Sequence, residues 1–219
     1  MSEARDDILG RIRNAVSGGT RAEAEARLKN HPRNLVPARA ASLDAEARAA
    51  LFVSMAEEAD ATVARVAAAD DVPREIARYL AERNLPARLV VTRDPKLDDL
   101  PWQETALAVR RGVAADDDAV GVTASFAAIA ETGTLMLVSG PESPTRNNFL
   151  PETHVVVLRA GEIVGSYEDA WDRLRAARAM PRVVNFITGP SRTGDIAQKL
   201  ELGAHGPRRL HIVLVEDGA

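Results

Sequence analysis

The 219-residue sequence contains no cysteine. Disulfides, zinc–thiolate sites, cysteine nucleophiles and cysteine-ligated iron–sulfur clusters are therefore excluded from this chain. Its four histidines, at positions 31, 154, 205 and 211, do not have the spacing of a metal site such as His-Glu-x-x-His. We expect no metal and no cofactor bound by the chain itself.

Long apolar runs and strong charge of one sign are also missing. No stretch approaches the ~18–20 apolar residues of a membrane span, and Met1–Asp7 lacks the basic start of a signal peptide. A net charge of −4 argues against nucleic-acid binding, which requires a basic face. No Gly-x-Gly-x-x-Gly follows a strand and there is no Walker A motif, which disfavours the common nicotinamide and nucleoside-triphosphate enzymes. The sequence predicts a cytoplasmic protein without a transmembrane segment.

The composition, 46% hydrophobic and 27% charged, is typical of one main globular domain. Residues 1–40 are predicted to form a separate N-terminal helical segment. Its first helix has apolar residues at helical spacing, its second is rich in charge and alanine, and a proline-containing linker follows. The main domain is therefore expected at residues 41–219.

Within the main domain, helical patterns alternate with short apolar strands, the pattern of an α/β domain. The later strands are continuous apolar runs rather than alternating ones, which indicates burial on both faces. These runs are 135–138, 155–158, 183–187 and 212–215. We predict a three-layer α/β/α fold with a mostly parallel sheet between two helical layers.

The first candidate site is the turn that contains Glu131, Thr132 and Gly133, together with Thr123. Ligands of open parallel sheets bind at the carboxyl ends of the strands, where such turns lie. Glu131, expected at the end of an apolar helical turn, can act as a general base or hold a substrate. Alternatively, it accepts backbone N–H bonds while Gly133 supplies a positive φ. Both interpretations are open.

The second candidate is the segment 189–195, which follows an apolar strand and precedes an expected helix at 196–202. Gly189, backbone amides and Arg192 would bind an anion at the helix N-terminus. Asp195, in the first helical turn, would repel an anion and bind a hydroxyl instead. The structural alternative is a helix start capped by Ser191 or Thr193.

The third candidate is the long polar segment 139–153 with Arg146, which is either a functional loop or a solvated one. His205, beside Gly206, is a possible acid or base near neutral pH, or a turn residue bonded to backbone. We expect the segment 189–195 and the Glu131 turn to form one pocket at the carboxyl edge of the sheet. That pocket would bind a small hydroxylated or carboxylated ligand.

In this order, the segments 121–137, 183–196 and 203–207 resemble the lactate-utilization (LUD) family, and most closely its small-subunit type. Apart from Thr123, the candidate residues named above fall on the family's motifs, and the resemblance covers roughly Gly121 to Val215. It implies a fold like that of ribose-5-phosphate isomerase, glucosamine-6-phosphate deaminase and the CoA transferases. It also implies a three-component system that oxidises L-lactate to pyruvate.

In such a system the iron–sulfur clusters belong to two partner subunits, and this chain would be the cluster-free component. Two alternatives are open. One is a free-standing isomerase or acyl/CoA transferase that uses Glu131 as base or nucleophile. The other is a non-catalytic binding or assembly module.

Overall fold

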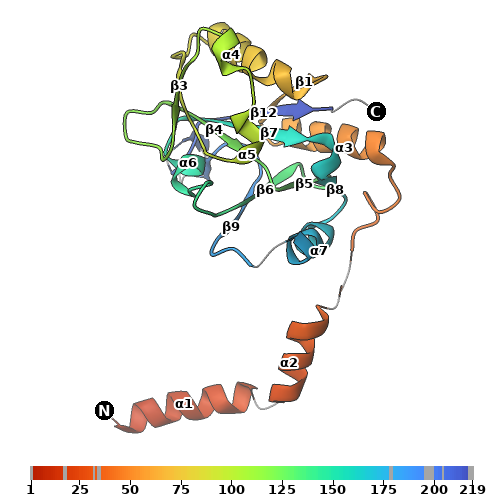
Figure 1. Ribbon diagram of the computed structural model, residues 1–219. Coiled ribbons are helices and arrows are strands. Elements are labelled where there is room, and N and C mark those ends of the chain that lie inside the picture. The colour runs from red at the N-terminus through yellow and green to blue at the C-terminus, as the bar shows by residue number, and fades with distance from the viewer. Residues whose placement is uncertain are drawn as a thin grey trace. The chain divides into compact units, whose positions relative to one another are not determined.

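The computed structural model describes residues 2–16, 19–31, 33, 36–177, 180–194, 200–203 and 205–216 (Figure 1). The chain separates into two compact units, residues 1–36 and 37–219. The first unit consists of the helices α1 (Ser2–Val16) and α2 (Arg21–Asn30). Thr20 and Glu23 form a capping box at the start of α2, in which each side chain accepts from the other's backbone N–H. None of the described helices is long and apolar enough to cross a membrane.

The second unit is built on a six-stranded sheet in which every neighbouring pair is parallel. The strand order is β1 (Thr62–Val66), β12 (Arg209–Val215), β7 (Thr153–Arg159), β4 (Val120–Ala124), β2 (Arg88–Val91) and β3 (Ala108–Arg111). The central strands β12, β7 and β4 begin level with one another, because Thr153 is paired with both Arg209 and Val120. Their almost complete burial agrees with the continuous apolar runs at 155–158 and 212–215.

A second, four-stranded sheet packs on one face of the first. Its order is β8 (Ile163–Val164), β5 (Ala127–Ile129), β6 (Thr134–Val138) and β9 (Val184–Ile187), and β6 runs antiparallel to both β5 and β9. The sequence pattern predicted that the runs 135–138 and 183–187 belong to the parallel sheet. They lie in the second sheet instead. The expected helical turn before Glu131 is also wrong, because β5 and β6 form a hairpin there.

The layers explain this difference. The helix α4 (Val72–Glu82) packs on one face of the large sheet, and α3 (Ala45–Glu58) and the second sheet pack on the other. The far face of the second sheet is covered by α7 (Tyr167–Ala177). The strands β4, β7 and β12 of the large sheet and β5 and β6 of the second sheet are thus buried on both faces. The predicted α/β class with a mostly parallel sheet flanked by helices is confirmed, and a small mixed sheet shares one of its layers (Figure 1).

Short elements complete the unit. They are η1 (Ala69–Asp71), α5 (Pro95–Asp98), η2 (Trp102–Glu104), α6 (Arg146–Phe149), η3 (Ala160–Glu162), β10 (Arg192–Gly194) and β11 (Leu200–Leu202). Two of them, α5 and η3, lie in the loops that follow β2 and β7, at the carboxyl ends of those strands.

Candidate functional site

Two short paired strands follow β9. Strand β10 pairs antiparallel with β11, so that Arg192 lies opposite Leu202. The predicted helix at 196–202 is therefore wrong for its last residues, 200–202, while residues 195–199, where that helix was expected to begin, lie outside the described residues. Leu200 and Leu202 also have the two-residue spacing of a strand, which outweighed the helical pattern. Asp195 and the side chain of Thr193 lie outside the described residues.

Four of the predicted site residues line one cavity of about 260 Å³. They are Gly189, Ser191, Arg192 and His205. We call it the amino-edge cavity, because His154 and Leu210, the second residues of β7 and β12, also line it. The predicted position at the carboxyl edge is thus wrong for this segment. The prediction assumed that the strand before Gly189 is a parallel strand of the large sheet. That strand, β9, belongs to the second sheet and runs antiparallel to its neighbour β6.

The walls of the amino-edge cavity combine apolar and polar side chains. Phe149, Phe186 and Ile187 supply apolar surface, while Thr188 joins the serine and histidines named above as a polar group. A mostly apolar hollow with a few polar groups is typical of small-molecule sites. The arrangement suits a ligand with one apolar and one polar end.

His154 is the most deeply buried polar group of the cavity wall, with 1% of its surface exposed. Its Nε2 lies 2.8 Å from Oγ1 of Thr123, a predicted site residue on β4. Burial lowers the pKa of His154 to about 3, so the imidazole is neutral at physiological pH. In the sequence, His154 stands directly before an apolar run and has no motif around it, so no local pattern marks it as a site residue.

Glu131 does not line the amino-edge cavity. It lies in the turn between β5 and β6, where its backbone N–H donates to the carbonyl of Gly165 at 3.3 Å. Its Oε2 is buried without a hydrogen-bond partner among the described residues. Burial raises the pKa of Glu131, an effect that a bond from the Tyr167 backbone opposes and the charge of Glu168 reinforces.

A chain of hydroxyl groups joins the Glu131 turn to the cavity. The Oγ1 atoms of Thr132 and Thr134 are 2.7 Å apart, and Thr134 is 2.7 Å from Oγ1 of Thr188, which lines the cavity. The hydroxyl of Tyr167 lies 3.0 Å from Thr134. The Glu131 turn is therefore linked by hydrogen bonds to Thr188, the residue directly before the segment 189–195, although the turn itself does not line the cavity.

Both predicted glycines press against the C-terminal turn of α3. A Cβ on Gly133 would lie 2.3 Å from the backbone nitrogen of Ala56, and one on Gly189 would lie 1.9 Å from the carbonyl oxygen of Ala59. Both glycines have positive φ, +64° and +71°. Only a residue without a side chain allows this approach, so both positions serve packing whatever else they do.

The two predicted arginines are engaged with the protein itself. Arg192 donates to Oδ2 of Asp60 at 3.0 Å and to the carbonyl of Ala59 at 3.1 Å, at the C-terminal end of α3. A cation at this end of a helix is favourable. Arg146, on α6, donates to Asp116 at 2.6 Å, is exposed and does not line the amino-edge cavity. Arg192 therefore contributes a cation to the cavity wall that is already paired with a carboxylate.

At the opposite, carboxyl edge of the large sheet, three loops bring together one residue each. None of these three residues was predicted from the sequence. Lys96 follows β2, Ser125 follows β4 and Glu162 follows β7. The Nζ of Lys96 donates to the carbonyl of Ser125 at 2.7 Å and forms an ion pair with Glu162, which is 7% exposed. Lys96 and Ser125 line a cavity of about 250 Å³. Each loop contributes one residue and none carries a motif, so only the fold brings them together.

Among the described residues, no group of three or more histidines and acidic residues is placed to hold a metal ion. A second buried histidine, His211, lies on the other face of the sheet, where burial lowers its pKa to about 4 and Glu75 opposes that effect.

These two histidines predict acid sensitivity. Their pKa values in the folded protein are below the ~6.5 of an unfolded chain. Their contribution to stability is therefore full above pH 6.5 and is lost as the pH falls toward the folded values of about 4 and about 3. At pH 5 we expect a loss of about 2 kcal/mol from each histidine, from the linkage relation.

Urea unfolding at pH 7 and pH 5 measures this loss. The variant His154→Gln should have roughly half of the wild-type pH dependence, while His31→Gln, a change at an exposed residue, should leave it unaltered. An equal pH dependence in wild type and His154→Gln would contradict the assignment.

Comparison with known proteins places these features in a family. The sequence model of the LUD domain matches residues 49–215. A lactate utilization protein C from Geobacillus thermodenitrificans is 31% identical over 131 residues, which are 55% of this chain and 55% of that protein. One from Bacillus subtilis is 35% identical over 102 residues, 45% of this chain and 42% of that protein. The chain thus spans about half the length of these curated relatives.

One solved structure has the same fold. It is a DUF162 family protein from Deinococcus radiodurans, 23% identical in sequence, with a TM-score of 0.58. The match covers 79% of this chain and 99% of that chain.

Proposed function

Because the chain belongs to the LUD domain family, we propose that it takes part in lactate utilization. The observation that carries this proposal is the name of its relatives: proteins of several bacteria that match it at about a third identity are each called lactate utilization protein C. The aligned regions are about half of each relative.

In its finer form, the proposal makes this chain the cluster-free subunit of a cytoplasmic three-component system that oxidises L-lactate to pyruvate. The oxidation removes two electrons and two protons from lactate. The chain has no cysteine to ligate a cluster, so the electrons would pass to two iron–sulfur partner subunits. If the partner subunits carry the electrons, the role left for this chain is to bind or position a ligand.

The amino-edge cavity is the site that we assign to this role. It is large enough for a small hydroxylated or carboxylated molecule and combines apolar walls with the neutral imidazole of His154. The Arg192 cation lies in its wall, where it can attract a carboxylate once its pairing with Asp60 is shared. The residues supply orientation, and no redox group is assigned to this chain.

Growth tests this proposal. A strain from which the gene is deleted should fail to grow on L-lactate and should grow normally on pyruvate, because pyruvate bypasses the oxidation. A tagged copy of the chain should restore growth and should co-purify with two proteins that contain iron and acid-labile sulfide. Normal growth of the deletion strain on L-lactate would exclude the proposed role.

If the tagged chain restores growth but purifies alone, the three-component form of the proposal is wrong and a free-standing enzyme is favoured. The control for growth on L-lactate is the deletion strain that carries the empty vector.

A further inference from the structure

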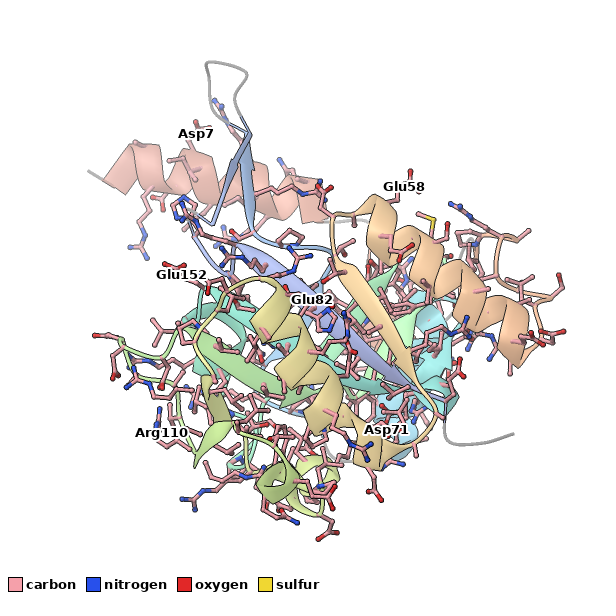
Figure 2. The ribbon with its side chains drawn as sticks, turned by 90° about the horizontal axis from the view of Figure 1, so that it is seen from above. Asp7, Glu58, Asp71, Glu82, Arg110 and Glu152 are labelled. Atoms are coloured by element: carbon pink, nitrogen blue, oxygen red, sulfur yellow. The ribbon has the colours of Figure 1, made fainter. Side chains whose placement is uncertain are left out.

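A second and larger cavity adjoins the amino-edge cavity. Its volume is about 630 Å³, and Pro190 and Leu210 line both hollows. It lies between the C-terminal end of α4, where Arg83 follows the helix, and the amino ends of β1 and β12. In Figure 2, Glu82 marks that end of α4. We call it the basic cavity.

Positive charge dominates the lining of the basic cavity. Three arginines contribute to it, Arg83, Arg208 and Arg209, and the single carboxylate among the lining residues, Asp60, is already paired with Arg192. The whole chain has a net charge of −4. A concave cluster of cations on an acidic protein attracts anions, because the surrounding low-dielectric walls concentrate its field.

The contacts of two of these arginines hold them in place without neutralising them. The guanidinium of Arg83 lies 4.9 Å from the ring centroid of Tyr79. Arg209 Nη1 donates to Oγ1 of Thr153 at 3.4 Å, a long and weak bond. Glu82, which directly precedes Arg83 in the sequence, forms its ion pair with Arg78 instead. Among the described residues, neither guanidinium group forms an ion pair with a carboxylate.

The floor of the cavity is rigid. The Tyr79 ring, 4% exposed, stacks on the ring of His211 with centroids 3.8 Å apart and planes 10° apart. The Nδ1 of His211 lies 2.9 Å from Oγ1 of Thr62, which also lines the cavity. A ligand would therefore meet a preformed surface, which lowers the entropy cost of binding.

We propose that the basic cavity binds a small anion with at least two negative charges, of the phosphate or polycarboxylate class, through Arg83 and Arg209. The planar fork of each guanidinium matches two oxygens of such a group. The inference goes beyond lactate utilization, since lactate carries one charge and needs only one cation. Because the two cavities share lining residues, the anion occupies a site directly beside the proposed lactate-related site.

Isothermal titration of the full chain with pyrophosphate, citrate and acetate at low salt tests this inference. We expect one saturable site for pyrophosphate or citrate, with a dissociation constant at least about tenfold lower than for acetate, because a single charge engages one arginine only. Tighter binding of pyrophosphate identifies the phosphate class, and tighter binding of citrate the polycarboxylate class. Absence of saturable binding by both would overturn the proposal.

Variants locate the site. Arg83→Gln and Arg209→Gln should each weaken binding about tenfold, the effect of one charge-assisted contact. Arg175→Gln removes the same charge from α7, which contributes no residue to this cavity, and should leave binding unchanged. Equal losses in all three variants would show a general charge effect and overturn the site.

Two further points keep the test decisive. Arg83→Lys retains the charge and should recover part of the binding that Arg83→Gln loses. If Arg83→Gln does not fold, as judged by circular dichroism, Arg209→Gln gives the result alone. The measurement is independent of growth on lactate, so its failure leaves the proposed function untouched and the reverse also holds.

Discussion

Replacement of Gly189 by alanine is expected to destabilise the folded protein by about 2–5 kcal/mol. A left-handed backbone conformation costs an alanine about 1–2 kcal/mol, and φ is +71° at this position. The new Cβ would also lie 1.9 Å from the carbonyl oxygen of Ala59. That oxygen belongs to the backbone at the end of α3, so relief requires a movement of the chain that costs about 1–3 kcal/mol more.

The same argument applies to Gly133, where the obstacle is the backbone of Ala56. Urea unfolding of Gly133→Ala and Gly189→Ala measures both effects. The control is Gly161→Ala, because a Cβ at Gly161 would meet no atom within 4 Å, and its change should stay within about 0.5 kcal/mol.

The result decides what these glycines do. A large loss of stability in both variants means that they are required for packing against α3, independently of any ligand. Stability close to that of Gly161→Ala would contradict the close approach and would leave a binding role as the better explanation of the two glycines.

Replacement of Lys96 by methionine should cost about 2–4 kcal/mol. The change leaves the carboxylate of Glu162, which is 7% exposed, without its cation, and leaves the carbonyl of Ser125 without its donor. Loss of one partner from a buried pair typically costs about 3–5 kcal/mol, and the partial exposure of Lys96, 32%, lowers that figure.

The double variant Lys96→Met/Glu162→Leu should recover most of the loss, because no uncompensated charge is left. Unfolding of the wild type, both single variants and the double variant gives the coupling energy between the two residues. Additive losses in the double variant would show that the pair does not interact.

Much of this protein can be read from the order of its residues. The absence of cysteine excludes thiolate-ligated clusters, and the apolar runs at 155–158 and 212–215 locate two central strands of the parallel sheet. The segments 121–137, 183–196 and 203–207 point to the LUD family, with which the match of residues 49–215 agrees. These features can be read from the sequence, because composition, periodicity and motif order do not depend on how the helices and strands are arranged in space.

Only the tertiary structure decided which edge each segment faces. Residues 184–187 of the run 183–187 form β9, a partly buried strand at the edge of the second sheet, and an apolar run contains no information about strand direction or sheet membership. The cavity next to β9 therefore lies at the amino edge of the large sheet, whereas the sequence predicted the carboxyl edge. Lys96 and Glu162, 66 residues apart, meet only because parallel strands bring the loops at their carboxyl ends together. Such contacts between distant loops leave no periodic trace in the sequence, which is why they had to be found in space.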